Sequence, residues 1–219
     1  MFITDRDLLA VEPNLFRDVQ WVGQRLCRGT GSALNTTLTL HESDTDFNDG
    51  DVRAGHVVVV DGASYEVIDR IGGNELVVSR LRASPLDFAI PVTPAESRPV
   101  VVTTFEPQIA MIHRQVLGML GVAPTPGEGP SESPVKGFVE SMILNPRDLA
   151  PVEVFGTLFL ALSAAAATSG PQSPLGIRAS FHRALFSQER ARAVAEIDAD
   201  GDGVAEVRRR MSVSVLRRE

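Results

Sequence analysis

Apolar residues at the start of the chain recur at helical spacing. Thr4 is followed three residues later by Asp7, which is the arrangement of a helix cap, and Pro13 suits the first turn of a helix. An apolar stripe follows, and most of its members are three or four residues apart: Leu15, Phe16, Val19, Val22 and Leu26. This pattern predicts a packed helix that ends near Gly29.

After Asn35 the pattern changes to short apolar runs separated by strong turn signals. Asp61-Gly62 and the Gly-Gly-Asn sequence at 72–74 are typical of hairpin turns. Runs with strand character cover residues 57–60, 65–71, 76–81, 88–92 and 99–103, and a shorter alternating run covers 37–40. About five short strands are enough to close a small barrel. We therefore predict an SH3-like or OB-like β-barrel over residues 50–103.

Helical spacing returns after Phe105. Pro107 suits the first turn of this helix, and Gly121 suits its end. Four apolar residues share one of its faces: Ile109, Ile112, Val116 and Leu120. Prolines, glycines and serines then dominate residues 121–137, which predicts a flexible loop that becomes ordered only where a partner covers it.

Two more helices are expected in the second half of the chain. Asn145-Pro146 opens a helix that is apolar on nearly every face, and such a helix belongs at the centre of a bundle or between subunits. Its most apolar stretch, residues 155–167, is shorter than the roughly 18 to 20 apolar residues that span a bilayer. Ser173-Pro174 opens the last helix. Three apolar residues share a face of it: Ile177, Phe181 and Leu185.

The C-terminal residues 204–216 alternate at the period of a β-strand. In a monomer this strand would present an unpaired sheet edge, so we expect it to pair with a partner. The side chains predicted to dock there are Arg208, Arg209, Arg210, Met211, Val213 and Val215.

Together these elements predict an α+β protein. Residues 1–36 and 104–190 would form a helical bundle, into which the small SH3-like barrel of residues 50–103 is inserted. Residues 121–137 would form the flexible loop, and residues 191–219 a C-terminal β-hairpin or extended arm.

Charge and cysteine content narrow the possible functions. The chain has 28 acidic and 21 basic residues and a formal net charge of -7, which argues against binding nucleic acid through its overall field. Cys27 is the only cysteine, so no internal disulfide forms, as is typical of cytosolic proteins. The N-terminus lacks the basic start and apolar stretch of a signal peptide, and no membrane association is expected.

One segment resembles a calcium-binding loop. Asp198, Asp200 and Asp202 occupy positions 1, 3 and 5 of such a loop, and a glycine follows at position 6. Glu206 stands at position 9, but position 12, where an EF-hand needs glutamate, is Arg209. The flanking residues also have strand character. The segment is therefore either a Ca²⁺ site or an acidic turn that joins two strands.

The sequence contains no recognisable catalytic constellation. The four histidines (His41, His56, His113 and His182) lack metal-site spacing, and no nucleophile elbow, Walker loop or dinucleotide-binding turn is present. Cys27, placed next to Leu26 in the predicted helix, is expected to be a buried thiol. We therefore predict a protein that is not an enzyme and needs no cofactor. A hydrolase built on Cys27 or on the acidic run 42–51 is the rival hypothesis.

Several segments together resemble head–tail connectors, also called adaptor or head-completion proteins, of tailed bacteriophages. The resemblance rests on the T-x-x-D-L-L-x-x-E-P-x-L-F-R-D-V pattern at 4–19, the small β module, the T-F-x-P-Q-I entry into a helix at 104–109, and the I-D-x-D-G-D-G-V sequence at 197–204 before an arginine-rich strand. It covers most of the chain as a succession of elements. The inserted β module departs from the simplest connectors, which are almost purely helical.

This resemblance implies a structural virion protein in the particle neck, assembled in the host cytoplasm. Such subunits form a ring, often of about twelve copies, between the portal and a tail terminator or other neck protein, and they extend a C-terminal arm to a neighbour. DNA passes through the ring without sequence-specific binding, which the acidic excess of this chain would suit. The alternative function is a calcium-binding interaction module that uses the Asp198, Asp200, Asp202 and Glu206 carboxylates.

Overall fold

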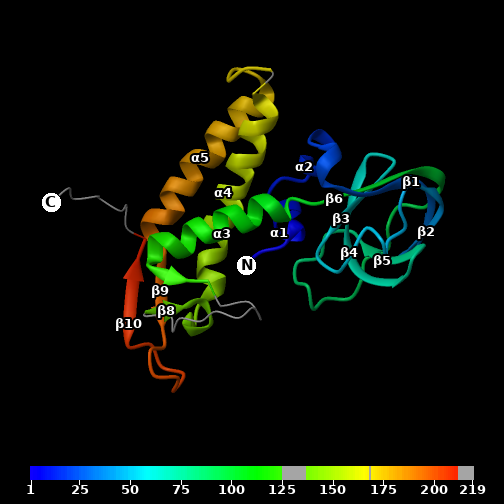
Figure 1. The fold of residues 1–219 in the computed structure, drawn as a ribbon. Coiled ribbons are helices and arrows are strands. Elements are labelled where there is room, and N and C mark those ends of the chain that lie inside the picture. The colour runs from blue at the N-terminus through cyan, green and yellow to red at the C-terminus, as the bar shows by residue number, and fades with distance from the viewer. Residues whose placement is uncertain (125–136, 168, 212–219) are drawn as a thin grey trace. The chain divides into compact units, whose positions relative to one another are not determined.

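The computed structural model describes residues 1–124, 137–167 and 169–211 (Figure 1). The chain divides into two compact units, which are described separately. The first, called the barrel unit, is Thr4–Pro107. The second, called the helical unit, combines Met1–Ile3 with Gln108–Glu219. The class is α+β, as predicted from the sequence.

The barrel unit contains a closed six-stranded antiparallel barrel with the strand order β1-β2-β5-β4-β3-β6. Its strands are β1 (Arg25–Leu34), β2 (Thr37–Ser43), β3 (Val57–Val60), β4 (Ala63–Gly72), β5 (Glu75–Ser79) and β6 (Ala95–Thr103). Alternate residues such as Val58, Val60, Val100 and Val102 fill its interior. The turn between β3 and β4 has positive φ at Asp61 (49°) and Gly62 (81°), as the predicted Asp-Gly hairpin requires. A small β-barrel module is therefore confirmed.

The barrel is larger than predicted, because β1 and β2 precede the expected boundary at residue 50. The helix predicted over residues 15–26 is wrong: helix α2 (Leu15–Asp18) is followed by the 3₁₀ turn η1 (Val22–Gln24), and β1 starts at Arg25. β1 pairs with both β2 and β6. These long-range pairings override the local helical spacing, because strand preference depends on cross-strand neighbours.

Two other local predictions in the barrel unit have opposite outcomes. Helix α1 (Asp5–Val11) begins with the predicted cap, in which the Thr4 backbone N–H donates to the Asp7 carboxylate at 2.8 Å. The strand predicted over residues 88–92 is wrong, because this stretch belongs to an irregular loop between β5 and β6. Pro85 and Pro91 lack the N–H group that a strand ladder needs.

The helical unit contains three long helices: α3 (Glu106–Leu120, whose first residues belong to the barrel unit), α4 (Pro146–Ala166) and α5 (Pro174–Arg192). Figure 1 shows α4 and α5 side by side, and the two helices pack against each other along their length. The predicted starts of α4 at Asn145-Pro146 and of α5 at Ser173-Pro174 are both confirmed. At the start of α5 the Ser173 hydroxyl accepts a hydrogen bond from the Gly176 N–H at 3.1 Å. Ile177 and Phe181 share a face of α5, but that face is mostly exposed.

Short strands complete the helical unit. β7 (Val122–Ala123) and β8 (Phe138–Val139) pair in parallel, and the 3₁₀ turn η2 (Glu140–Met142) follows β8. β9 (Val194–Ile197) and β10 (Val207–Arg210) form an antiparallel hairpin. The predicted loop over residues 121–137 and the predicted arm beyond residue 211 lie largely outside the described residues.

Helix α4 has the length and apolar character of a membrane-crossing helix, with a mean hydropathy of 1.7 over its best window. This apolar stretch is longer than the residues 155–167 considered above. Within the helical unit, 56% of that window is buried, and the core helix of a soluble protein has the same properties. Leu149, Val152, Leu158 and Leu162 are among its buried residues, so α4 contributes much of the core of its own unit.

Candidate functional site

The loop between β5 and β6, residues 80–94, exposes two large apolar side chains. Leu86 is 94% exposed and Phe88 is 97% exposed, the highest values among the large apolar residues that the structure describes. We call these two residues the apolar loop tip. Single exposed apolar residues are common on proteins, but two at the tip of one loop form a compact contact point for another molecule.

A buried ion-pair cluster holds the base of this loop. Glu66 on β4 is fully buried, and its carboxylate accepts hydrogen bonds from the Arg82 Nε at 2.6 Å and from the Arg6 Nε at 2.5 Å. The Arg82 backbone N–H donates to the same carboxylate at 3.0 Å. Each charge in the cluster is paired, which a buried charge requires. The cluster therefore ties the start of the loop to β4 and to helix α1.

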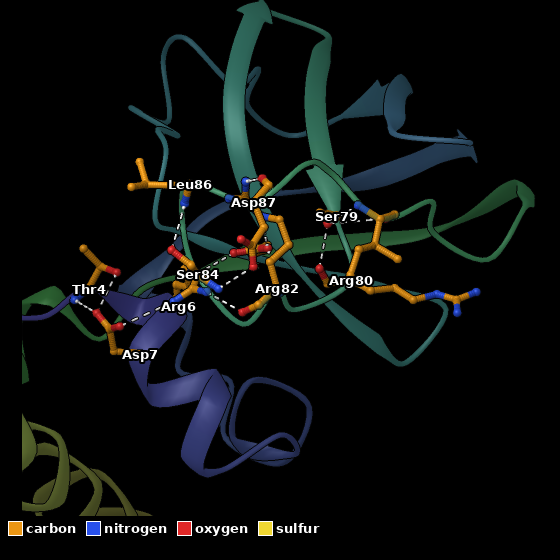
Figure 2. Close-up of polar contacts among 11 residues, drawn as sticks. Thr4, Arg6, Asp7, Ser79, Arg80, Arg82, Ser84, Leu86 and Asp87 are labelled. Carbon is orange, nitrogen blue, oxygen red and sulfur yellow. Dashed lines mark hydrogen bonds and ion pairs between the residues drawn. The ribbon is translucent and has the colours of Figure 1, made fainter.

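Further hydrogen bonds fix the path of the loop (Figure 2). The Arg82 guanidinium donates to the Asp87 carbonyl at 2.6 Å, and the Ser84 N–H donates to the Asp87 carboxylate at 2.8 Å. At the far end, the Ile90 N–H donates to the Ser79 hydroxyl at 2.8 Å. These hydrogen bonds hold the backbone on both sides of the apolar loop tip, which lowers the entropic cost of ordering the loop on association.

The predicted calcium loop lies in the β9–β10 hairpin of the helical unit. Its four carboxylate residues, Asp198, Asp200, Asp202 and Glu206, each offer an oxygen within 4.8 Å of the others. The flanking elements are strands, as expected, so the site is not the helix–loop–helix of an EF-hand. Gly201 and Gly203 have φ values of 86° and 85°, which let the backbone fold tightly around Asp198.

Backbone N–H groups already hold this acidic turn together. The two Asp198 oxygens accept from Gly201 N–H at 2.6 Å and from Gly203 N–H at 2.8 Å. These bonds lower the pKa of Asp198 below its usual value. Asp202 accepts from the Val204 N–H and Glu206 from the Ala199 N–H. With one oxygen from each carboxylate the turn supplies four of the six to eight oxygens that Ca²⁺ takes, so bidentate carboxylates, water or backbone oxygens would have to complete the shell.

The predicted docking residues of the C-terminal strand have different surroundings. Arg209 donates to the Leu120 and Gly121 carbonyls at 2.9 Å and 3.1 Å, and its guanidinium lies 4.7 Å from the centre of the Phe138 ring. Met211 is buried. These two side chains are used within the helical unit. Arg208 and Arg210 are exposed on the other face of β10, with Arg208 2.9 Å from Glu196. Val213 and Val215 lie outside the described residues.

The expectation that residues 204–216 leave an unpaired strand is only partly met, because β10 pairs with β9 of the same chain. The hairpin has only two strands, and in the part of the chain that the structure describes no strand pairs with the outer edge of β10. That edge still has backbone groups to offer to a partner.

The helical unit also contains a buried charge cluster that the sequence did not predict. His113 Nδ1 hydrogen-bonds the carboxylate of Glu153, which is fully buried, and His113 Nε2 lies 3.0 Å from the Glu140 Oε1. The second Glu153 oxygen accepts from the Phe2 N–H at 2.9 Å. Burial alone would lower the pKa of His113, but the two carboxylates outweigh it and raise that pKa. Residues 40 positions apart carry no joint sequence signal, so only the fold reveals the cluster.

Cys27 is buried, as predicted, although it lies on β1 and not on a helix. Its Sγ donates to the Thr45 carbonyl at 3.0 Å, and burial raises the pKa of the thiol to about 12. A nucleophilic cysteine needs the thiolate form. The thiol version of the hydrolase hypothesis therefore has no physical support in this geometry.

His56 is buried beside Glu106, whose Oε1 lies 3.4 Å from its Nε2. Its pKa is lowered, because burial outweighs the nearby carboxylate. His41 accepts or donates one hydrogen bond with Ser32 at 2.7 Å. Neither histidine belongs to a group of metal-ligating side chains, since the acidic turn is the only such group within the described ranges.

Comparisons with known proteins identify no relative: neither a protein-family model, nor a curated protein, nor a solved structure matches the chain. The function is therefore inferred from the sequence of the chain and from the geometry of its own residues.

Proposed function

We propose that this chain is a non-enzymatic assembly subunit that docks onto another polypeptide through the apolar loop tip. The supporting observation is that Leu86 and Phe88 are almost fully exposed although their loop is fixed by the buried Glu66 cluster. Aromatic and aliphatic side chains that enter a partner's pocket contribute most of the energy of many interfaces. Because the loop is already ordered, less of this binding energy is offset by the entropic cost of ordering it on association.

The specific assembly we propose is the neck of a tailed bacteriophage. The chain would act there as a ring-forming adaptor between the portal and a tail terminator or other neck protein, with DNA passing through the ring. The succession of elements that resembles connectors supports this proposal, and the net charge of -7 suits a conduit that must release its DNA. The SH3-like character of the barrel and the grouping of the helices into a bundle belong to the same proposal.

In this proposal the C-terminal hairpin contacts a neighbouring subunit. The outer edge of β10 can accept a strand from a neighbouring copy, and Arg208 and Arg210 beside it can contact acidic partner surfaces. Arg209 and Met211 would instead keep the hairpin attached to its own unit.

Light scattering on the purified chain and on two variants tests the docking role. We expect the wild type to form oligomers and the Leu86→Ser, Phe88→Ser double variant to lose them. Both side chains are exposed, so the free energy of unfolding of the double variant should differ from that of the wild type by no more than about 0.5 kcal/mol. The matched control is Ile71→Ser, which removes an apolar side chain that is 60% exposed at the end of β4.

Two results would speak against this function. A wild type that is monomeric at all concentrations and absent from purified particles would remove the connector assignment. Equal oligomerisation of the double variant and of Ile71→Ser would show that the apolar loop tip is not the contact. Electron microscopy of the particle neck would locate the ring directly.

A second candidate function is calcium binding, favoured by the four carboxylates within 4.8 Å of one another. Millimolar Ca²⁺ should then raise the melting temperature, and Asp200→Asn with Asp202→Asn should abolish the rise. Glu42→Gln with Glu96→Gln, at exposed positions in the barrel unit, is the charge-matched control. An unchanged melting temperature of the wild type in Ca²⁺ would eliminate this function.

A further inference from the structure

The barrel unit contains a pocket of about 480 Å³. One wall is formed by residues 17–22, which lead from helix α2 into the turn η1, and the other walls come from β1, β3 and β6. All of these residues belong to the same compact unit. A pocket of this volume is in the range that small ligands occupy.

The charge of the pocket is opposite to that of the chain. Arg17, Arg25 and Arg28 line it, and no aspartate or glutamate does, although the net charge of the chain is -7. Arg17 and Arg25 have carboxylate neighbours at 3.1 Å and 3.5 Å, but these are partly exposed pairs of the kind that contribute little. The Arg28 guanidinium has no ion pair with any carboxylate of the described residues. The pocket is thus a local site for a ligand with negative charge.

An aromatic side chain lies beside the arginines. The Trp21 ring packs edge-to-face on Phe105, with ring centres 5.7 Å apart, which fixes its orientation at the pocket wall. Val59, Pro99 and Val101 add apolar surface. A ligand that matches this lining has a planar or apolar body attached to its negative group.

A buried hydroxyl without a partner completes the wall. Thr103 lines the pocket and is 2% exposed, and its Oγ1 has no hydrogen-bond partner among the residues that the structure describes. An unpaired buried hydroxyl is destabilising, and such groups are rare in folded proteins. A polar atom of a ligand that reaches it would remove that cost.

We propose that this pocket binds a nucleotide unit, with its phosphate held by Arg17, Arg25 and Arg28 and its base placed against Trp21. Arginine binds phosphate through two parallel hydrogen bonds, and aromatic rings stack on bases of any sequence. The unit can come from a free mononucleotide or from a single strand. The proposal is independent of the docking function, because the pocket residues and the apolar loop tip do not overlap.

Trp21 makes the test direct, because it is the only tryptophan in the chain. AMP should quench its fluorescence saturably, whereas adenosine and inorganic phosphate should each bind much more weakly, since each lacks one half of the ligand. Higher salt should weaken AMP binding through screening. Tighter binding of an eight-nucleotide oligo(dA) than of AMP would identify a single strand as the source, and equal or weaker binding a free nucleotide.

Variants of residues that line the pocket, compared with one of an arginine outside it, test the proposal further. Arg28→Gln should weaken AMP binding about tenfold or more, as expected for loss of a charge-assisted hydrogen bond. Arg80→Gln, at an exposed arginine outside the pocket lining, should bind as the wild type does. Thr103→Val should keep or raise the melting temperature while weakening AMP binding, which a purely structural role for Thr103 would not produce.

Three outcomes would overturn the proposal. The first is an absence of quenching by both AMP and oligo(dA) at millimolar concentration. The second is equal AMP binding by Arg28→Gln and Arg80→Gln. The third is quenching by a glutamate-rich peptide but not by AMP, which would make the pocket a docking site for acidic protein segments.

Discussion

Glu66 and Arg82 form an ion pair of 2.6 Å in the interior of the barrel unit, where the Glu66 side chain has no exposure at all. Arg6 joins the same carboxylate from helix α1 at 2.5 Å. The loop that carries Leu86 and Phe88 starts at this cluster, so the exposed docking residues depend on a buried charge on β4.

Replacing Glu66 by glutamine should lower the free energy of unfolding by about 3–5 kcal/mol, because it leaves the buried Arg82 guanidinium without a countercharge and Arg6 with only the Asp7 carboxylate at 3.7 Å. Chemical denaturation of the barrel unit within the full chain measures this loss. Arg98→Gln is the control, since its pair with Asp61 spans 3.7 Å with both side chains 56% exposed. That change should cost less than about 1 kcal/mol. Similar losses in the two variants would contradict the structural role of Glu66.

Asp5 should make the stability of the barrel unit depend on pH. Burial raises its pKa to about 7, while the hydrogen bond from the Phe105 N–H at 2.8 Å opposes that rise. Because the folded pKa lies above the unfolded value, the contribution of this group to stability is complete below about pH 4 and is lost as pH rises through 7.

Asp5→Asn removes this titration and keeps the acceptor for Phe105. At pH 8 the variant should be more stable than the wild type by up to about 4 kcal/mol, and at pH 4 the difference should disappear. Urea denaturation at several pH values tests this prediction, with the exposed Asp61→Asn as control. A difference that stays constant between pH 4 and pH 8 would mean that Asp5 does not titrate in this range.

His113 should titrate above its ordinary range in the helical unit. Burial lowers its pKa, but the hydrogen bond and charge of Glu153 and the nearby Glu140 together raise it. Its folded pKa is raised, so its contribution to stability is complete below about pH 6.5 and is lost as pH rises through the folded pKa. NMR titration of the ring should show the raised pKa.

Glu153→Gln should bring the pKa of His113 down, because it removes the closest negative charge. Glu96→Gln, at an exposed position in the barrel unit, is the charge-matched control and should leave the pKa of His113 unchanged. A pKa of His113 that is unaffected by Glu153→Gln would show that the two side chains do not interact in solution.

Gly156 should tolerate no larger residue on α4. A Cβ atom there would lie 2.8 Å from Ile112 and 3.0 Å from Phe186, so Gly156→Ala should destabilise the helical unit by about 1–3 kcal/mol. Gly118 on α3 has open space around it, and Gly118→Ala should instead stabilise the helix by up to about 1 kcal/mol. Thermal denaturation distinguishes the two, and a stabilising Gly156→Ala would contradict the close packing of α4.

Sequence reasoning located those elements whose signals are local. The hairpin strands β3, β4 and β5, the cap at Thr4, and the helix starts at Asn145-Pro146 and Ser173-Pro174 all depend on residues within a few positions of one another. β1 was mistaken for helix because its identity depends on pairing with β6, some seventy residues away along the chain. Local spacing cannot report such a partner.

The candidate sites divide in the same way. The acidic turn between β9 and β10 is contiguous, so its carboxylates could be found from spacing alone. The Glu66 cluster unites residues from α1, β4 and the β5–β6 loop, and the arginine pocket unites α2 with three strands. Neither has a sequence motif, because folding alone brings these residues together. The exposure of Phe88 was also unforeseen, since the run around it has the composition of a buried strand.

The position of Cys27 makes its thiol a probe of local opening in the barrel unit. The sulfur lies inside the closed barrel with 1% of the residue exposed, and no second cysteine competes for a reagent. A thiol-specific label can therefore react only when the surroundings of Cys27 open, either the barrel itself or the segment at Thr45, whose carbonyl accepts from the sulfur. Its rate of incorporation reports this local opening of the barrel unit under native conditions.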